Sequence, residues 1–95
     1  MRSYRNLDIW QKSLEILRLV YNLSNKFPES EKYGLTVQIK RAVVSILSNI
    51  AEGSGRNSNQ QMINFLSISK GSDFEVEAQL IIAFELNYIT ESELN

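Results

Sequence analysis

The polar residues that could do chemistry in this sequence lie in one stretch, residues 38–56. Arg41, Ser45 and Asn49 follow one another at steps of four, which places them on one side of a helix. Cysteine and histidine are both absent, which excludes thiolate and imidazole metal sites, cysteine nucleophiles and histidine bases. An all-carboxylate metal site is not excluded, but no pattern favours it. We therefore predict no catalytic residue, no cofactor, no metal and no small-molecule substrate.

The same three residues instead predict a structural polar network. The glycine-rich stretch 53–57 follows a helix and lacks the spacing of a phosphate-binding loop, so it is interpreted as a turn between antiparallel helices. Folding the chain at this turn places Arg41 opposite Ser72 and within reach of Glu75. We predict that Arg41 and Glu75 form an interhelical ion pair that fixes the register. The full predicted network is Arg41, Ser45, Asn49 and Glu75.

The helix that positions these residues is marked by an apolar stripe. Ile39, Val43, Ile46 and Ile50 recur at alternating steps of four and three, which predicts a central helix from about residue 36 to residue 52. Pro28 and the acids after it predict a separate helical turn, with a break at Tyr33–Gly34. A continuous helix over residues 29–53 is the alternative.

Local signals place the other helices. Asp8 and Gln11 fit a capping box that starts a first helix, which should end near Phe27 because Pro28 follows. A second capping box at Ser58 starts a helix of about 28 residues that continues to Leu86. Within that helix, Gly71 should let another backbone approach closely.

The last residues contain the start of a further helix. Asn87 is a plausible C-terminal cap, and Thr90 with Glu93 forms a third capping box that is followed by only two residues. We predict one domain over residues 1–95, an all-α antiparallel up-down bundle with three long helices and a truncated fourth. A three-helix bundle is the alternative. Because the fourth helix is short, the apolar surface of the central helix or of its neighbours should be partly exposed unless another chain covers it.

The charges are unevenly distributed, although the formal net charge is only −1. All ten lysines and arginines precede residue 71, and the last 25 residues hold six of the eleven acids. This pattern fits ordinary solvated helix faces, head-to-tail attraction between subunits, or a basic surface for RNA or DNA. The candidate nucleic-acid contacts are Lys40, Arg41, Arg56 and Lys70. No apolar run approaches the roughly 20 residues that span a bilayer, and no leader is evident, so we predict a cytoplasmic protein without a membrane segment.

Four segments resemble the bacterial family encoded by intervening sequences in 23S ribosomal RNA genes, also called S23 ribosomal proteins. They are LDIWQKS near the start, GLTVQIKRAVVSILSNIAEGSGR in the middle, and FLSISKGSDFEVEAQL and ELNYI after it. The resemblance covers residues 5 to 90, and SNIAEG is its most specific block. In fold, the family is similar to the accessory variability determinant proteins of diversity-generating retroelements.

The resemblance implies an antiparallel four-helix bundle that assembles as a homopentamer. It implies no enzymatic activity, and it suggests nucleic-acid binding through the retroelement relatives. Asp73 departs from the family pattern, where this position is usually apolar.

Overall fold

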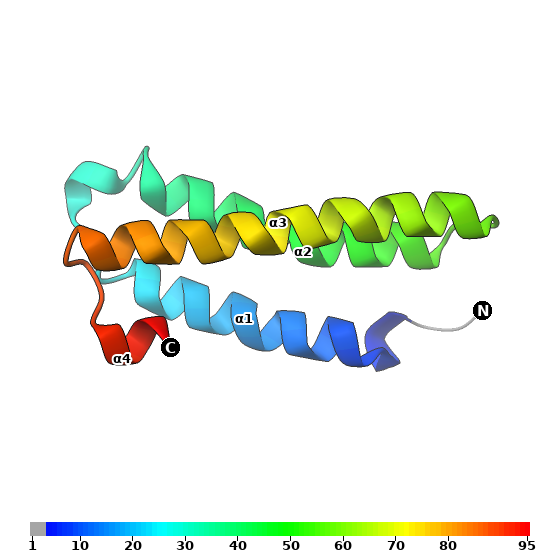
Figure 1. Cartoon of the computed structure of the whole chain (residues 1–95), viewed down its shortest axis with the longest axis horizontal. Coiled ribbons are helices and arrows are strands. Elements are labelled where there is room, and N and C mark those ends of the chain that lie inside the picture. Colours follow the sequence, from blue (N-terminus) through cyan, green and yellow to red (C-terminus); the bar gives the residue numbers. More distant parts are fainter. Residues whose placement is uncertain (1–3) are drawn as a thin grey trace.

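The computed structural model describes residues 4–95, and every regular element in that range is a helix (Figure 1). The order is η1 (Tyr4–Asn6), α1 (Asp8–Ser24), η2 (Glu29–Glu31), α2 (Leu35–Ser54), α3 (Asn59–Glu85) and α4 (Glu91–Leu94). The predicted all-α fold with three long helices and a short fourth is therefore confirmed. The helices run up and down a body of 44 × 21 × 18 Å.

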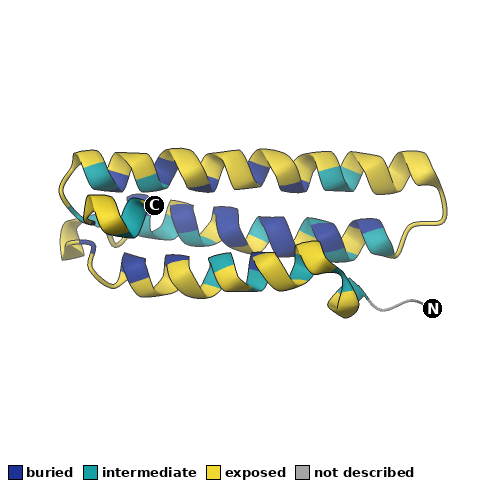
Figure 2. Cartoon of the chain, turned by 60° about the horizontal axis from the view of Figure 1, so that its bottom comes forward, coloured by how far each residue is buried: buried dark blue, intermediate teal, exposed yellow. Residues whose placement is uncertain are grey.

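The central helix is α2, which packs against both α1 and α3. Figure 2 shows α2 between the other two long helices, with its buried residues facing the space between them. The predicted stripe of Ile39, Val43, Ile46 and Ile50 is buried, with at most 4% of each residue exposed. Burial of such side chains is the main favourable term in folding. The rest of the core comes from all the long helices and the C-terminal corner, namely Val20, Leu23, Phe27, Leu35, Ala42, Val76, Ala83 and Ile89.

The first helix begins at Asp8, as predicted, but the capping box there was wrong. Leu7 occupies the N-cap position and no side chain accepts a capping hydrogen bond. The Gln11 side chain instead donates a 2.8 Å bond to the carbonyl of Arg5, which ties α1 to η1. The helix ends at Ser24, three residues before Phe27, and the next residues continue as tighter turns.

The predicted break before α2 is confirmed, and the alternative of one continuous helix is wrong. The single turn η2 is separated from α2 by Gly34, which is the N-cap of α2. Glu31 completes this junction, because its Oε1 accepts a 3.0 Å bond from the backbone N–H of Leu35. A carboxylate at this position satisfies an N–H that has no partner within the helix.

The turn between α2 and α3 is shorter than predicted, because α2 continues through Gly53 to Ser54. Gly53 lies against α3, and a Cβ built there would come within 3.1 Å of Phe65 Cβ. Half of the capping box predicted at Ser58 is formed, since the Ser58 side chain accepts a 3.1 Å bond from the N–H of Gln61, but among residues 4–95 the structure shows no reciprocal bond from the Gln61 side chain. The helix that follows has 27 residues, close to the predicted length.

Gly71 does not have the predicted role within this chain. It is exposed, and a Cβ built there would meet nothing within 4 Å among the described residues. The close approach of backbones occurs at Gly53 instead, which lies near the helix–helix turn.

The end of α3 follows the sequence signals. Asn87 has a φ of 64°, the left-handed conformation that asparagine tolerates at a helix C-terminus. The N–H of Tyr88 bonds the carbonyl of Ala83 and the N–H of Asn87 bonds that of Phe84, the pattern of a Schellman motif. The capping box of Thr90 and Glu93 is then formed as predicted and starts the four-residue α4.

Candidate functional site

A row of small polar side chains joins α2 to α3. Ser69 Oγ donates a 2.8 Å hydrogen bond to the carbonyl of Ile46, and Ser72 Oγ donates a 2.9 Å bond to Ser45 Oγ. Asn49 Nδ2 donates to Ser45 Oγ at 3.0 Å and to the Ser45 carbonyl at 2.8 Å. Two predicted network residues, Ser45 and Asn49, are therefore brought together. The sequence reasoning did not identify Ser72 as the buried partner of Ser45, nor the bond from Ser69 to Ile46.

The predicted register was off by one helical turn. Ser45, and not Arg41, lies opposite Ser72. Among residues 4–95, Arg41 makes no ion pair with Glu75 within 4.0 Å, so the predicted interhelical pair is not formed in this chain. Glu75 Oε1 instead accepts a 3.3 Å bond from Nε2 of Gln79, one turn further along α3. Both Arg41 and Glu75 are exposed.

The row does not have the arrangement of a catalytic site. The hydroxyls of Ser69 and Ser72 are buried and each donates to another protein oxygen. Within the described part of the chain, no three carboxylates come together as a metal-ion site. The row can set the register of the helices, because a shift of either helix would leave buried hydroxyls unpaired.

The candidate nucleic-acid contacts are divided between different surfaces. Lys40 and Arg41 line one shallow groove on the outside of α2, where the Lys40 ammonium lies 5.0 Å from the centre of the Tyr21 ring. Arg56 pairs with Glu52 at 2.8 Å and lies over the Phe65 ring. Lys70 lines a different groove, so the four residues do not form one continuous strip.

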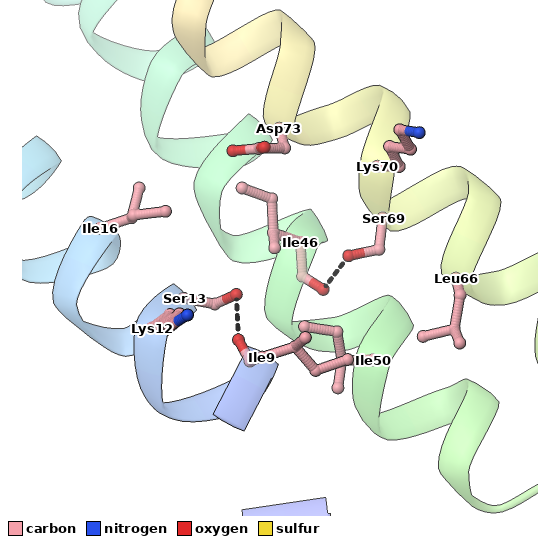
Figure 3. A pocket seen from close by; sticks show the side chains of 10 residues that line it. All are labelled: Ile9, Lys12, Ser13, Ile16, Ile46, Ile50, Leu66, Ser69, Lys70 and Asp73. Atoms are coloured by element: carbon pink, nitrogen blue, oxygen red, sulfur yellow. Dashed lines mark hydrogen bonds between the residues drawn. The ribbon is translucent and has the colours of Figure 1, made fainter. Parts of the chain in front are cut away.

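The groove that contains Lys70 runs between α1 and α3, with α2 as its floor (Figure 3). It has a volume of about 370 Å³. Its walls are mainly apolar, and its charged side chains are Lys12, Lys70 and Asp73. The Asp73 position is exposed, which explains how this helix accepts a carboxylate where the family pattern is apolar. The apolar lining residues are Ile9, Ile16, Ile46, Ile50 and Leu66.

The helix α4 covers one end of the space between α1 and α3 (Figure 2). Leu94 packs against the core, and the side chain of Glu93 forms an ion pair with Lys26 at the end of α1. The Lys26 side chain, followed by the backbone N–H of Thr90, lowers the pKa of Glu93. These contacts hold α4 against the end of the bundle where α1 ends.

The most extensive unpartnered feature of the chain is the outer surface of α3. Five large apolar residues of α3, together with its C-cap Leu86, are more than 40% exposed, and Phe74 reaches 61%. At about 3.6 residues per turn they form two rows, one with Ile63, Phe74 and Ile81 and the other with Ile68, Ile82 and Leu86. This confirms the prediction that the apolar neighbours of the central helix are partly bare. The six residues are Ile63, Ile68, Phe74, Ile81, Ile82 and Leu86.

Comparison with known families agrees with this fold. The model of one family, described as 23S rRNA-intervening sequence protein, matches residues 5–95, and the chain belongs to that family. A search of curated proteins found no matching relative. Among residues 4–95, none of the helices has both the length and the apolar character needed to cross a membrane.

Proposed function

We propose that this member of the 23S rRNA-intervening sequence protein family is a non-enzymatic scaffold or adaptor that works as a homo-oligomer. The pentamer is the stoichiometry that the family resemblance implies. A bacterial protein is what the resemblance further implies, and the cytoplasmic location predicted from the sequence is part of the same proposal. The proposed task is to present surfaces to partners rather than to transform a substrate.

The observation that carries this proposal is the exposure of apolar side chains in two rows along α3, beyond the side that packs on α2. A helix whose apolar residues extend beyond its core-facing stripe has more apolar surface than its own chain covers. Single exposed apolar residues are common on monomers, but a set that follows one helix for its whole length marks an interaction surface. Association with other copies of the same chain would bury this apolar surface, and no different partner would be needed.

The test is the mass of the protein in solution. Light scattering and native mass spectrometry at micromolar concentration should give an integer multiple of 10.9 kDa, and a fivefold multiple for the pentamer. Ile68→Glu, which places a charge on the bare surface of α3, should shift the mass toward the monomer. Asn22→Glu adds the same charge at an exposed position of α1, away from α3, and is the matched control. A wild-type protein that remains a 10.9 kDa monomer contradicts the proposal.

The alternative is an accessory protein that binds RNA or DNA. The observation in its favour is the groove on α2, where Lys40 and Arg41 lie beside the exposed ring of Tyr21. Cations next to an aromatic face are the elements that single-stranded nucleic acid contacts.

Fluorescence anisotropy with labelled RNA and DNA tests this alternative. Binding that weakens as salt increases, and that is lost in Lys40→Ala/Arg41→Ala, is the expected result. Lys70→Ala, which removes a lysine from the other groove, is the control. The absence of salt-dependent binding at low ionic strength would rule the alternative out.

A further inference from the structure

Arg41 and Glu75 lie level with each other on adjacent helices, although they are not paired. The contact between Ser45 and Ser72 fixes one level of the antiparallel helices α2 and α3. Arg41 is four residues before Ser45, about 6 Å along the axis, and Glu75 is three residues after Ser72, about 4.5 Å in the same direction. The two opposite charges therefore differ in height by only about 1.5 Å.

Each of these charges lies between two apolar side chains of its own helix that are at least partly exposed. On α2, Val37 and Val44 lie one turn to either side of Arg41, and all three line the same shallow groove. On α3, Ile68 and Ile82 lie seven residues before and after Glu75, and both are about half exposed. One row is thus apolar with a positive centre, and the other is apolar with a negative centre.

We propose that these two rows are the two halves of a subunit interface, in which Arg41 of one copy pairs with Glu75 of a second copy. This inference rests on the proposed homo-oligomer and names the surface that forms it. The charge distribution of the chain supports the choice of a second copy as partner. On α2 the basic residues are Lys40 and Arg41, whereas α3 after residue 70 carries four acids and no base, so this part of α3 in one copy complements the Lys40–Arg41 pair of another.

The level position of the two residues is the condition that a rotation axis parallel to the helices requires. Rotation about an axis parallel to the helices moves each copy around the axis but keeps every residue at its own height. Arg41 can then meet Glu75 of the next copy only because the two residues are level within one chain. A two-fold dimer and a closed ring with this axis both satisfy the condition.

The geometry within one chain leaves both side chains available for this contact. Arg41 has no ion-pair partner among residues 4–95, and Glu75 accepts only the long 3.3 Å bond from Gln79. When apolar neighbours exclude water from an ion pair, each charge is stabilised only by its partner. Reversing one of the two charges therefore strongly weakens the association of the subunits. This dependence makes the pair testable by charge reversal.

The experiment uses Arg41→Glu and Glu75→Arg, separately and as a mixture, in the full chain. Each variant alone should associate with itself at least about 30-fold more weakly than the wild type, because like charges then meet across the interface. In an equimolar mixture, R41E copies should associate with E75R copies, because an R41E copy presents two carboxylates and an E75R copy presents two guanidinium groups. A two-fold dimer or a ring of even number can alternate the two variants completely, whereas a five-membered ring keeps one interface between like copies and should regain association only in part. Native mass spectrometry resolves mixed from unmixed assemblies. Circular dichroism checks that each variant keeps its helices.

Arg18→Glu on α1 and Glu77→Arg on α3 change the net charge equally at exposed positions and should leave association unchanged. A monomeric wild type overturns the proposed oligomer itself. A wild-type oligomer that both R41E and E75R preserve overturns this interface but leaves the oligomer standing. The double variant R41E/E75R, compared with the mixture of single variants, distinguishes an ion pair within one chain from an ion pair between two copies. If it restores association but the mixture of single variants does not, the pair forms within the chain and the inference fails.

Discussion

The Tyr88 hydroxyl donates a 2.8 Å hydrogen bond to Oε2 of Glu31 and thereby joins the corner after α3 to the turn before α2. The other oxygen of the same carboxylate accepts the backbone N–H of Leu35. The Leu35 N–H, followed by the Tyr88 hydroxyl, lowers the pKa of Glu31, while the Glu31 carboxylate raises the pKa of Tyr88. One ionised side chain therefore holds two distant parts of the chain together.

Glu31→Gln should reduce the dependence of stability on acid pH. Because the folded state lowers the pKa of Glu31 below its ordinary value of 4.5, the ionised carboxylate stabilises the fold fully above that pH. The stabilisation is lost as pH falls through the lower folded-state pKa. The melting temperature of the wild type should therefore fall more steeply than that of E31Q on acidification. Thermal melts followed by circular dichroism measure this, and Glu29→Gln, on the same turn, is the control. The prediction would be contradicted if the melting temperatures of the wild type and E31Q fell equally steeply on acidification.

Local sequence signals predicted most helix ends, whereas features that depend on contacts between residues far apart in the sequence were not predicted. Ser58 and Thr90 cap helices as predicted, because a cap needs only residues three positions away. The same reasoning failed at Asp8, because Gln11 bonds the Arg5 carbonyl of η1 instead. The Glu31–Tyr88 bond spans 57 residues, and no local pattern indicates such a contact.

The register of α2 against α3 shows the same limit. Counting from the glycine turn placed Arg41 opposite Ser72, one turn away from the observed partner Ser45. The helix continues through Gly53 because that residue packs against Phe65, which shortens the turn and shifts the facing positions. The sequence shows which residues are small and polar, but only packing decides which of them meet.

Gly71→Ala should stabilise the fold more than Gly53→Ala does. Alanine favours a helix over glycine by about 1 kcal/mol, and a Cβ at Gly71 meets nothing within 4 Å among the described residues. G71A should therefore raise the free energy of unfolding by up to about 1 kcal/mol. At Gly53 a Cβ would lie 3.1 Å from Phe65 Cβ and 3.3 Å from the Met62 carbonyl, so strain offsets the helical gain. Urea titration measures both, and an equal gain in the two variants would disprove the packing role of Gly53.

Gln79→Met should stabilise the fold. Gln79 is only 6% exposed, and its Oε1 is buried without a hydrogen-bond partner among residues 4–95. Methionine has a similar length and shape but no amide, so it removes the desolvated oxygen at the expense of one 3.3 Å bond to Glu75. We expect a gain on the order of 1 kcal/mol in the free energy of unfolding. Gln60→Met, at an exposed position of the same helix, is the control. A loss of stability specific to Q79M would show that the buried oxygen has a partner.

Ser69→Ala should destabilise the junction of α2 and α3. The Ser69 hydroxyl is buried and donates a 2.8 Å bond to the carbonyl of Ile46, and a bond of this kind contributes about 1 kcal/mol. Alanine also improves helix propensity, which would hide part of this loss. Ser67→Ala, at an exposed position of the same helix, makes the same gain without losing the interhelical bond. The difference in unfolding free energy between S69A and S67A therefore isolates the contact. A difference near zero would mean that the hydroxyl row contributes nothing to the packing of α2 on α3.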